Sequence, residues 1–223
     1  MSLASVLPPL LLVLGLPRCD GDSRVSNANL FIDTLLLGRM PKLAPFEGIE
    51  PYEMDPVFVR VNIKNTFGHR FKANFSSTTV TGLSKVKRFN DCSRAAIRNG
   101  NITITCTVNF KEIEIFLDGF GDGDTTLKRS HRVQAKATFD ETYALIEIAG
   151  PNRNEPGSLM RFDLSTIKLI IEPAESISLS SDRLAEFRMN LNNELSDRMK
   201  VLFDGKYKKV LENAISTVNL PPV

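Results

Sequence analysis

Two hydrophobic periods divide this sequence. From Val57 to Ile171, apolar residues recur mainly at every second position, the spacing that turns one side of a β-strand toward a core. From Ser181 onward they recur at steps of three and four, which is the spacing of one helix face. A shorter stretch with helical spacing comes first, over residues 27–40. The pattern therefore predicts a short helix, many strands and one long helix, in that order.

The first helix is expected to be short. Its apolar positions include Phe31, Leu35 and Leu36, and Gly38 followed by Pro41 is a typical helix end. Residues 41–56 are rich in proline and acidic residues, so we expect a loop there.

The strand region contains several places where the alternation changes. Residues 102–110 alternate most clearly, and the phase shift after them predicts a β-bulge near Lys111. The glycine-spaced segment Asp118–Asp124 predicts a turn. Residues 159–171 are expected to form one long last strand, which Ile177 and Leu179 would extend.

The last apolar stripe predicts a helix of roughly 35 residues, about 50 Å long at 1.5 Å per residue. Ser181 is its expected cap, and Asp204-Gly205 is expected to interrupt or bend it. Such a stripe needs a long apolar partner, which a strongly twisted antiparallel sheet would supply. The predicted fold class is α+β, with a highly curved antiparallel sheet wrapped around the long C-terminal helix and a short N-terminal helix.

The chain has 223 residues and begins with an apolar block, Leu7–Leu16. About ten apolar residues are too few to span a bilayer, which takes roughly 20, but they fit a signal peptide. We expect a signal peptide over residues 1–19 and one domain over 20–223 in a secreted, extracellular protein; a retained membrane anchor is the alternative. The formal net charge of +2 lacks the excess of basic residues that a nucleic-acid partner requires.

One of the three cysteines falls within the expected signal peptide, which leaves Cys92 and Cys106. An even number in an exported chain favours a disulfide between them, and two reduced, buried thiols are the alternative. Asn99-Gly100 is typical of a hairpin tip. A three-residue loop there would place Cys92 opposite Cys106, whereas a two-residue loop would place Cys92 opposite Thr107.

Other surface features fit an exported protein. Asn74 and Asn101 begin N-x-[ST] sequons and are candidate glycosylation sites. Lys85, Lys87 and Arg88 could attract anionic lipid heads, which predicts a transient contact with a membrane surface; a solvated strand face is the alternative.

Catalytic motifs are missing from the sequence. The two histidines, His69 and His131, lie among basic residues, and no G-x-S-x-G, H-E-x-x-H or phosphate-loop pattern occurs. We therefore expect no enzyme and no cofactor, with a hydrolase that depends on His131 as a distant alternative. The Asp118–Asp124 segment lacks the ligand spacing of a calcium loop because Phe120 stands at a ligand position, so no metal is expected.

Three segments resemble a known superfamily. They are the run Ile113–Asp124, the strand Thr79–Phe89 with its Gly-Leu-Ser pattern, and the closing segment Val201–Glu212. Together they resemble the arthropod branch of the tubular lipid-binding superfamily, which includes takeout proteins, juvenile-hormone-binding proteins and mite group 7 allergens. The position of Cys92 and Cys106 favours the mite-allergen-like or salivary members over the hormone carriers.

The resemblance implies a carrier or scavenger that holds a lipid or another hydrophobic small molecule in an apolar tunnel between sheet and long helix. An extracellular interaction protein of innate-immune or allergen-like type, without a small-molecule ligand, is the alternative. The residues expected to line the tunnel come from the inner sheet face, the long helix and the first helix: Phe31, Leu35, Leu36, Val86, Ile113, Ile115, Leu117, Leu195, Met199, Leu202 and Phe203.

Overall fold

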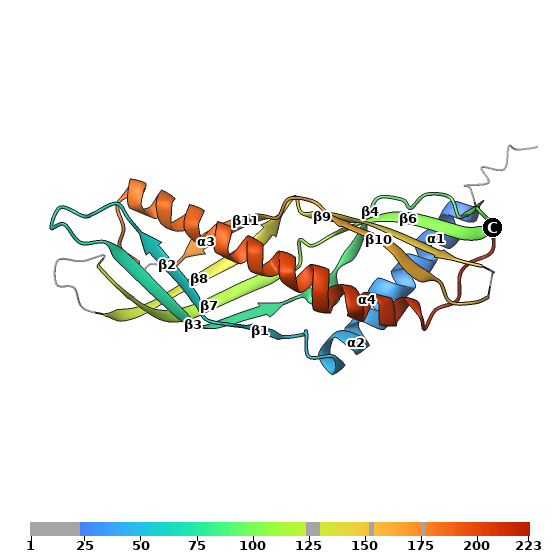
Figure 1. Ribbon diagram of the computed structural model, residues 1–223, viewed down its shortest axis with the longest axis horizontal. Coiled ribbons are helices and arrows are strands. Elements are labelled where there is room, and N and C mark those ends of the chain that lie inside the picture. The colour runs from blue at the N-terminus through green and yellow to red at the C-terminus, as the bar shows by residue number, and fades with distance from the viewer. Residues whose placement is uncertain (1–22, 124–129, 152–153, 175–176) are drawn as a thin grey trace, which may run out of the picture.

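The computed structural model describes residues 23–123, 130–151, 154–174 and 177–223. The described chain is elongated, and one long helix runs beside two antiparallel sheets that follow each other along the molecule (Figure 1). The predicted fold class is thereby confirmed, with the refinement that two sheets rather than one surround the helix. The expected signal peptide, residues 1–19, lies outside the described residues.

The N-terminal helical region is longer than the sequence pattern predicts. Helix α1 (Ser23–Asp33) continues through a π-helical turn, η1 (Thr34–Arg39), into α2 (Met40–Phe46). The expected helix end at Pro41 is wrong because this proline lies in the first turn of α2, where a missing backbone N–H costs little. Residues 41–46, expected to form a loop, are therefore helical.

The first sheet has six strands within the described residues, and all pairs are antiparallel. Its order is β1-β3-β7-β8-β11, and β2 pairs with β3 beside β1. The strands are β1 (Tyr52–Met54), β2 (Val57–Val61), β3 (Phe71–Thr81), β7 (Glu114–Asp122), β8 (His131–Asp140) and β11 (Lys168–Pro173).

The second sheet has five strands within the described residues, in the order β10-β9-β6-β4, with β5 also paired to β6. A short 3₁₀ turn, η2 (Leu83–Lys85), joins the first sheet to it. The strands are β4 (Lys87–Phe89), β5 (Ala96–Arg98), β6 (Asn101–Asn109), β9 (Tyr143–Gly150) and β10 (Ser158–Leu164).

The long helix spans residues 181–215, as the periodicity predicts. The expected cap is wrong by one residue, because Ser181 is the first helical residue and Ser180 stands at the cap position. It consists of α3 (Ser181–Leu202), a π-helical turn η3 (Phe203–Tyr207) and α4 (Lys208–Ile215). Gly205 lies in the π-helical turn, so the expected interruption takes the form of a widened turn within a continuous helix. The apolar stripe of the helix is buried in one hydrophobic core with the inner faces of both sheets.

Two strand predictions are wrong at places where the chain crosses from one sheet to the other. The alternation of apolar and polar residues continues across these places, so the sequence pattern does not reveal them. The expected bulge near Lys111 is a turn in which the Ile113 N–H donates to the Phe110 carbonyl at 3.0 Å, and it carries the chain from β6 into β7. Residues 159–171 form β10 and β11, which belong to different sheets. Residues 177–180 form no strand.

The glycine-spaced segment Asp118–Asp124 is not a turn over its length, because β7 continues to Asp122. A Cβ atom at Gly119 would collide with the backbone carbonyl of Asn74 on β3, where the β3–β7 register also shifts. Gly119 therefore permits a close approach of two strands. The chain turns at Gly123, whose φ of 86° suits glycine.

The predicted disulfide between Cys92 and Cys106 is present, with a Cα–Cα distance of 4.4 Å. The hairpin loop expected to align the cysteines is wrong, since Arg98 pairs directly with Asn101 across a two-residue Asn99-Gly100 turn. Both turn residues have positive φ, at 51° and 80°. Cys92 reaches Cys106 because residues 90–95 are irregular and change the register between β5 and β4.

Candidate ligand-binding site

The residues expected to line a tunnel all lie in the single hydrophobic core. They come from the N-terminal helices, the inner sheet faces and the long helix, and none is more than 4% exposed. The structure thus brings together the set Phe31, Leu35, Leu36, Val86, Ile113, Ile115, Leu117, Leu195, Met199, Leu202 and Phe203. Their contact with a ligand remains a prediction.

Aromatic rings fill the middle of the seam between helix and sheets. The Phe203 ring lies 4.6 Å from the ring of Phe110, 5.4 Å from that of Tyr207 and 6.0 Å from that of Phe139, measured between centroids. Edge and tilted contacts of this kind stabilise a packed core. The seam at this point is therefore occupied by side chains.

Three buried hydroxyl groups have no hydrogen-bond partner among the described residues: Thr78 on β3, and Ser196 and Tyr207 on the long helix. Complete burial raises the pKa of Tyr207, so this phenol is neutral and keeps its proton available to donate. A buried hydroxyl without a partner costs about 1–3 kcal/mol. These groups are the polar atoms in the core that a bound molecule could satisfy.

A groove of about 570 Å³ opens where the long helix passes β1. Met54 and Leu202 give it an apolar floor, and Tyr52 forms one wall. Its rim is polar and includes Arg198 and Lys206 from the helix. Leu202 is the one predicted tunnel residue that lines this groove.

The cationic rim is held in place by specific contacts. Arg198 donates to the backbone carbonyls of Asp55 and Pro56 at 2.9 and 3.0 Å and pairs with Glu194 at 2.7 Å. The Lys206 ammonium lies 4.8 Å from the centre of the Tyr52 ring, a cation–π distance. The rim therefore combines the Lys206 ammonium with an Arg198 that Glu194 balances, and the Asp55 carboxylate also lines the groove beside the apolar floor.

The π-helical turn leaves the groove open. Gly205 lines the groove, and among the described residues no atom outside the adjoining helix backbone lies within 4 Å of the position its Cβ would take. Pattern reasoning found Leu202 from its place in the apolar stripe but missed Tyr52, Met54 and the rim. The available signal was Asp204-Gly205, because π-helical turns are frequent at functional sites.

Two other predicted surface features have defined surroundings. Asn74 and Asn101 are both exposed, and Asn74 lies on the outer face of the first sheet between Phe58 on β2 and Phe120 on β7. In the basic cluster beside η2, Lys87 pairs with Glu112 at 3.0 Å.

Arg88, the third member of that cluster, pairs with Asp33 of α1 at 2.9 Å, and this hydrogen bond raises the pKa of Arg88. Two of the three cations in the cluster are thus balanced by acids. The cluster therefore has less free positive charge for a membrane contact than its sequence implies.

Two kinds of feature are absent from the described residues. They contain no group of three His, Cys, Asp or Glu side chains arranged to hold a metal ion. None of their helices combines the length and apolarity required to cross a membrane.

The fold and the groove define an elongated α+β protein in which two antiparallel sheets share one long helix beside a groove with an apolar floor and a charged rim. No protein-family model matches the sequence. The chain is 27% identical over 207 residues to salivary anticoagulant protein P23 of Ixodes scapularis, covering 89% of this chain and 91% of that protein. The crystal structure of Takeout 1 from Epiphyas postvittana matches with a TM-score of 0.46 and 9% identity, covering 88% of this chain and 94% of that one.

Proposed function

We propose that this protein is an extracellular carrier or scavenger of a hydrophobic small molecule that carries a polar, anionic end. The groove between β1 and the long helix is the observation that supports this best. Its volume of about 570 Å³ is within the usual range of small-molecule sites, roughly 300–1,000 Å³. The disulfide and the salivary relative support an extracellular location.

The ligand would bind by burial and charge, without covalent chemistry. An anionic head would lie near Lys206, and an apolar tail would extend over Met54 and Leu202 toward the seam. A ligand that buries about 300 Å² of apolar surface gains about 7 kcal/mol from burial, from which the entropy cost of association is subtracted. Deeper entry would require seam side chains to move, and the buried hydroxyls there could then bond the ligand.

The chain offers a matched pair of variants to test the groove. Gly205 and Gly38 both lie in π-helical turns, and both have open space where a Cβ would stand, but Gly205 lines the groove and Gly38 does not. Displacement of 1-anilinonaphthalene-8-sulfonate by palmitate would measure binding. We expect Gly205→Leu to weaken palmitate binding at least tenfold and Gly38→Leu to leave it unchanged.

Two results would contradict this proposal, the first its site and the second the carrier function itself. One is equal palmitate binding by both variants, since the groove would then not be the site. The other is native mass spectrometry of protein from its natural source that shows no co-purified apolar compound, together with no displacement by any of a panel of lipids.

An interaction protein without a small-molecule ligand is the second candidate, and the salivary relative favours it. That relative is named an anticoagulant, and the side chains that fill the seam are consistent with a protein that acts through its surface. Plasma clotting time in the presence of the purified protein tests this function. Prolonged clotting by both wild type and Gly205→Leu would favour a surface-mediated activity over ligand carriage.

A further inference from the structure

One end of the molecule carries a surface that is both cationic and apolar. The connection between β2 and β3, residues 62–70, forms this end together with the adjoining strand ends (Figure 1). The sequence contains no Asp or Glu from Val57 to Asn90. We call the exposed cations here the basic tip: Arg60, Lys64, Arg70 and Lys72.

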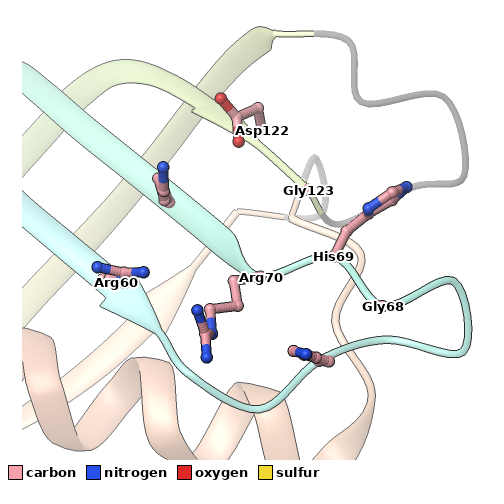
Figure 2. Close-up of a pocket in the computed structure, with 8 residues that line it drawn as sticks. Arg60, Gly68, His69, Arg70, Asp122 and Gly123 are labelled. Atoms are coloured by element: carbon pink, nitrogen blue, oxygen red, sulfur yellow. The ribbon is translucent and has the colours of Figure 1, made fainter.

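The cations surround a hollow of about 470 Å³, with His69 and Asp122 also in its lining (Figure 2). Arg60 and Lys72 are directly paired residues of β2 and β3 and face the same side of the sheet. Like charges at facing positions destabilise a sheet. Asp122 faces Lys72 from β7 and offsets part of this repulsion, but the hollow keeps a net positive charge.

An aromatic side chain projects from the apex of the same connection. Phe67 is 59% exposed and Ile63 is 44% exposed. The turn that presents Phe67 is closed by hydrogen bonds, since the Asn65 side-chain oxygen accepts the N–H groups of Phe67 and His69, both at 2.9 Å. The Asn65 N–H also donates to the His69 carbonyl at 2.9 Å. Phe67 is therefore displayed by an ordered turn.

The long helix fixes the base of this turn. Glu186 of α3 accepts the backbone N–H groups of Asn62 and Ile63 at 2.9 and 3.0 Å. Arg183, buried at the start of α3, donates to the carbonyls of Ile63 and Gly123 at 3.2 and 2.7 Å. The exposed apolar residues and the cations thus stand on a scaffold that is anchored to the core.

We propose that the basic tip docks this protein end-on onto membrane surfaces rich in anionic phospholipid. Anionic lipid heads would neutralise the facing cations, and Phe67 would enter the interfacial layer, where exposed aromatic side chains are favoured. A soluble polyanion would use the same cations but would gain nothing from an exposed Phe67, so the apex residue favours the membrane. The groove contains no residue of the basic tip, and the inference is independent of the carrier function.

Co-sedimentation with phosphatidylserine–phosphatidylcholine vesicles and with vesicles of phosphatidylcholine alone tests the proposal. We expect binding to the anionic vesicles alone, and weaker binding at higher salt because charges are screened. Each cation contributes about fivefold near such a surface. The variant Arg60→Gln/Lys64→Gln/Arg70→Gln/Lys72→Gln should therefore bind at least a hundredfold more weakly.

A control variant removes four exposed cations elsewhere and has the same net charge: Lys42→Gln/Arg98→Gln/Lys111→Gln/Lys209→Gln. It should bind as wild type does. Unfolding temperatures show that both variants fold. The tip variant loses a like-charge pair but also the Arg70 hydrogen bond to the Asn62 carbonyl, so its stability should change little. Equal loss of binding in both variants would mean that net charge alone matters and would overturn the proposal.

A substitution at Phe67 distinguishes a membrane partner from a soluble polyanion. Phe67→Ala should weaken vesicle binding about tenfold, while Phe46→Ala, which removes an 85% exposed phenylalanine on α2, should not. Wild-type binding by Phe67→Ala, combined with tight heparin binding through the same cations, would assign the tip to a sulfated polysaccharide instead. Equal binding to both vesicle types would also refute the proposal.

Discussion

Replacing Phe203 by alanine measures how solidly the seam is packed. Phe203 stands in the π-helical turn of the long helix and has no exposed surface. Its ring touches those of Phe110, Tyr207 and Phe139, at 4.6, 5.4 and 6.0 Å between centroids. The substitution therefore removes the ring at the centre of this aromatic group.

The size of the loss depends on whether the surroundings are filled. Phe→Ala in a packed core costs about 3–5 kcal/mol, because a cavity is left in addition to the lost transfer energy. Each lost aromatic contact adds about 0.5–1.5 kcal/mol, which places Phe203→Ala near the upper end, at about 4–5 kcal/mol. If the seam were hollow, only the burial of one side chain would be lost, about 1.5–3 kcal/mol.

Guanidinium unfolding followed by circular dichroism, with the disulfide intact, provides the assay. An unchanged m-value would show that the difference in midpoint reports stability. Phe46→Ala is the control, and its exposed ring predicts a change of less than about 0.5 kcal/mol. A loss below about 3 kcal/mol for Phe203→Ala would refute the packed seam and would favour a tunnel along the helix.

Three further predictions follow from local geometry. Replacing Cys92 and Cys106 by serine opens a loop with a sequence separation of 14 and should lower the free energy of unfolding by about 3 kcal/mol, measured by denaturant titration. Two backbone N–H groups lower the pKa of Glu186, so its stabilisation is complete above the ordinary pKa and is lost as pH falls through the lowered value. Glu186→Gln should thus reduce the acid dependence of stability, and an unchanged pH profile would contradict this. Gly119→Ala should lower the unfolding temperature by several degrees, because the new Cβ meets the backbone of Asn74.

The spacing of hydrophobic residues correctly predicts the helices and strands that bury one face along their whole length. The long helix follows its apolar stripe from Ser181 to Ile215 because each turn packs on the same core. Strand β6 follows the alternation of residues 102–109 for the same reason. The spacing does not show that the chain crosses from one sheet to the other near Lys111. Both sheets face one core, so the alternation of apolar residues resumes after the turn.

Glycine and proline were harder to interpret from sequence. Glycine is common in turns and therefore predicts a turn at Gly119, yet the role of Gly119 is to let β7 approach β3 closely. Pro41 was expected to end a helix, yet it stands at a helix start, where proline is tolerated. The role of Gly119 depends on a neighbouring strand, and the role of Pro41 depends on where the helix begins. Local composition specifies neither.

The candidate site was predicted only in part. Sequence reasoning selected apolar residues of the core, and Leu202 among them borders the groove. The remaining lining joins Tyr52 and Met54 with Gly205 and Lys206, which are distant in sequence and mixed in character. Their proximity results from the packing of β1 against the long helix, and no local pattern contains that information.

The charge arrangement on the outer face of the first sheet argues that the basic tip is functional. Between β7 and β8, exposed cations are matched by acids: Arg132 pairs with Asp118 at 2.7 Å, and Lys136 with Glu114 at 2.8 Å. At the β2–β3 end of the same sheet, Arg60 instead faces Lys72, and Asp122, which faces Lys72 from β7, offsets only part of this repulsion. Selection for stability alone would favour an acid at one of these two positions, as it has between the neighbouring strands. A local departure from a rule that the same sheet otherwise follows is expected where a surface is shaped for a partner, and here that partner must be negatively charged.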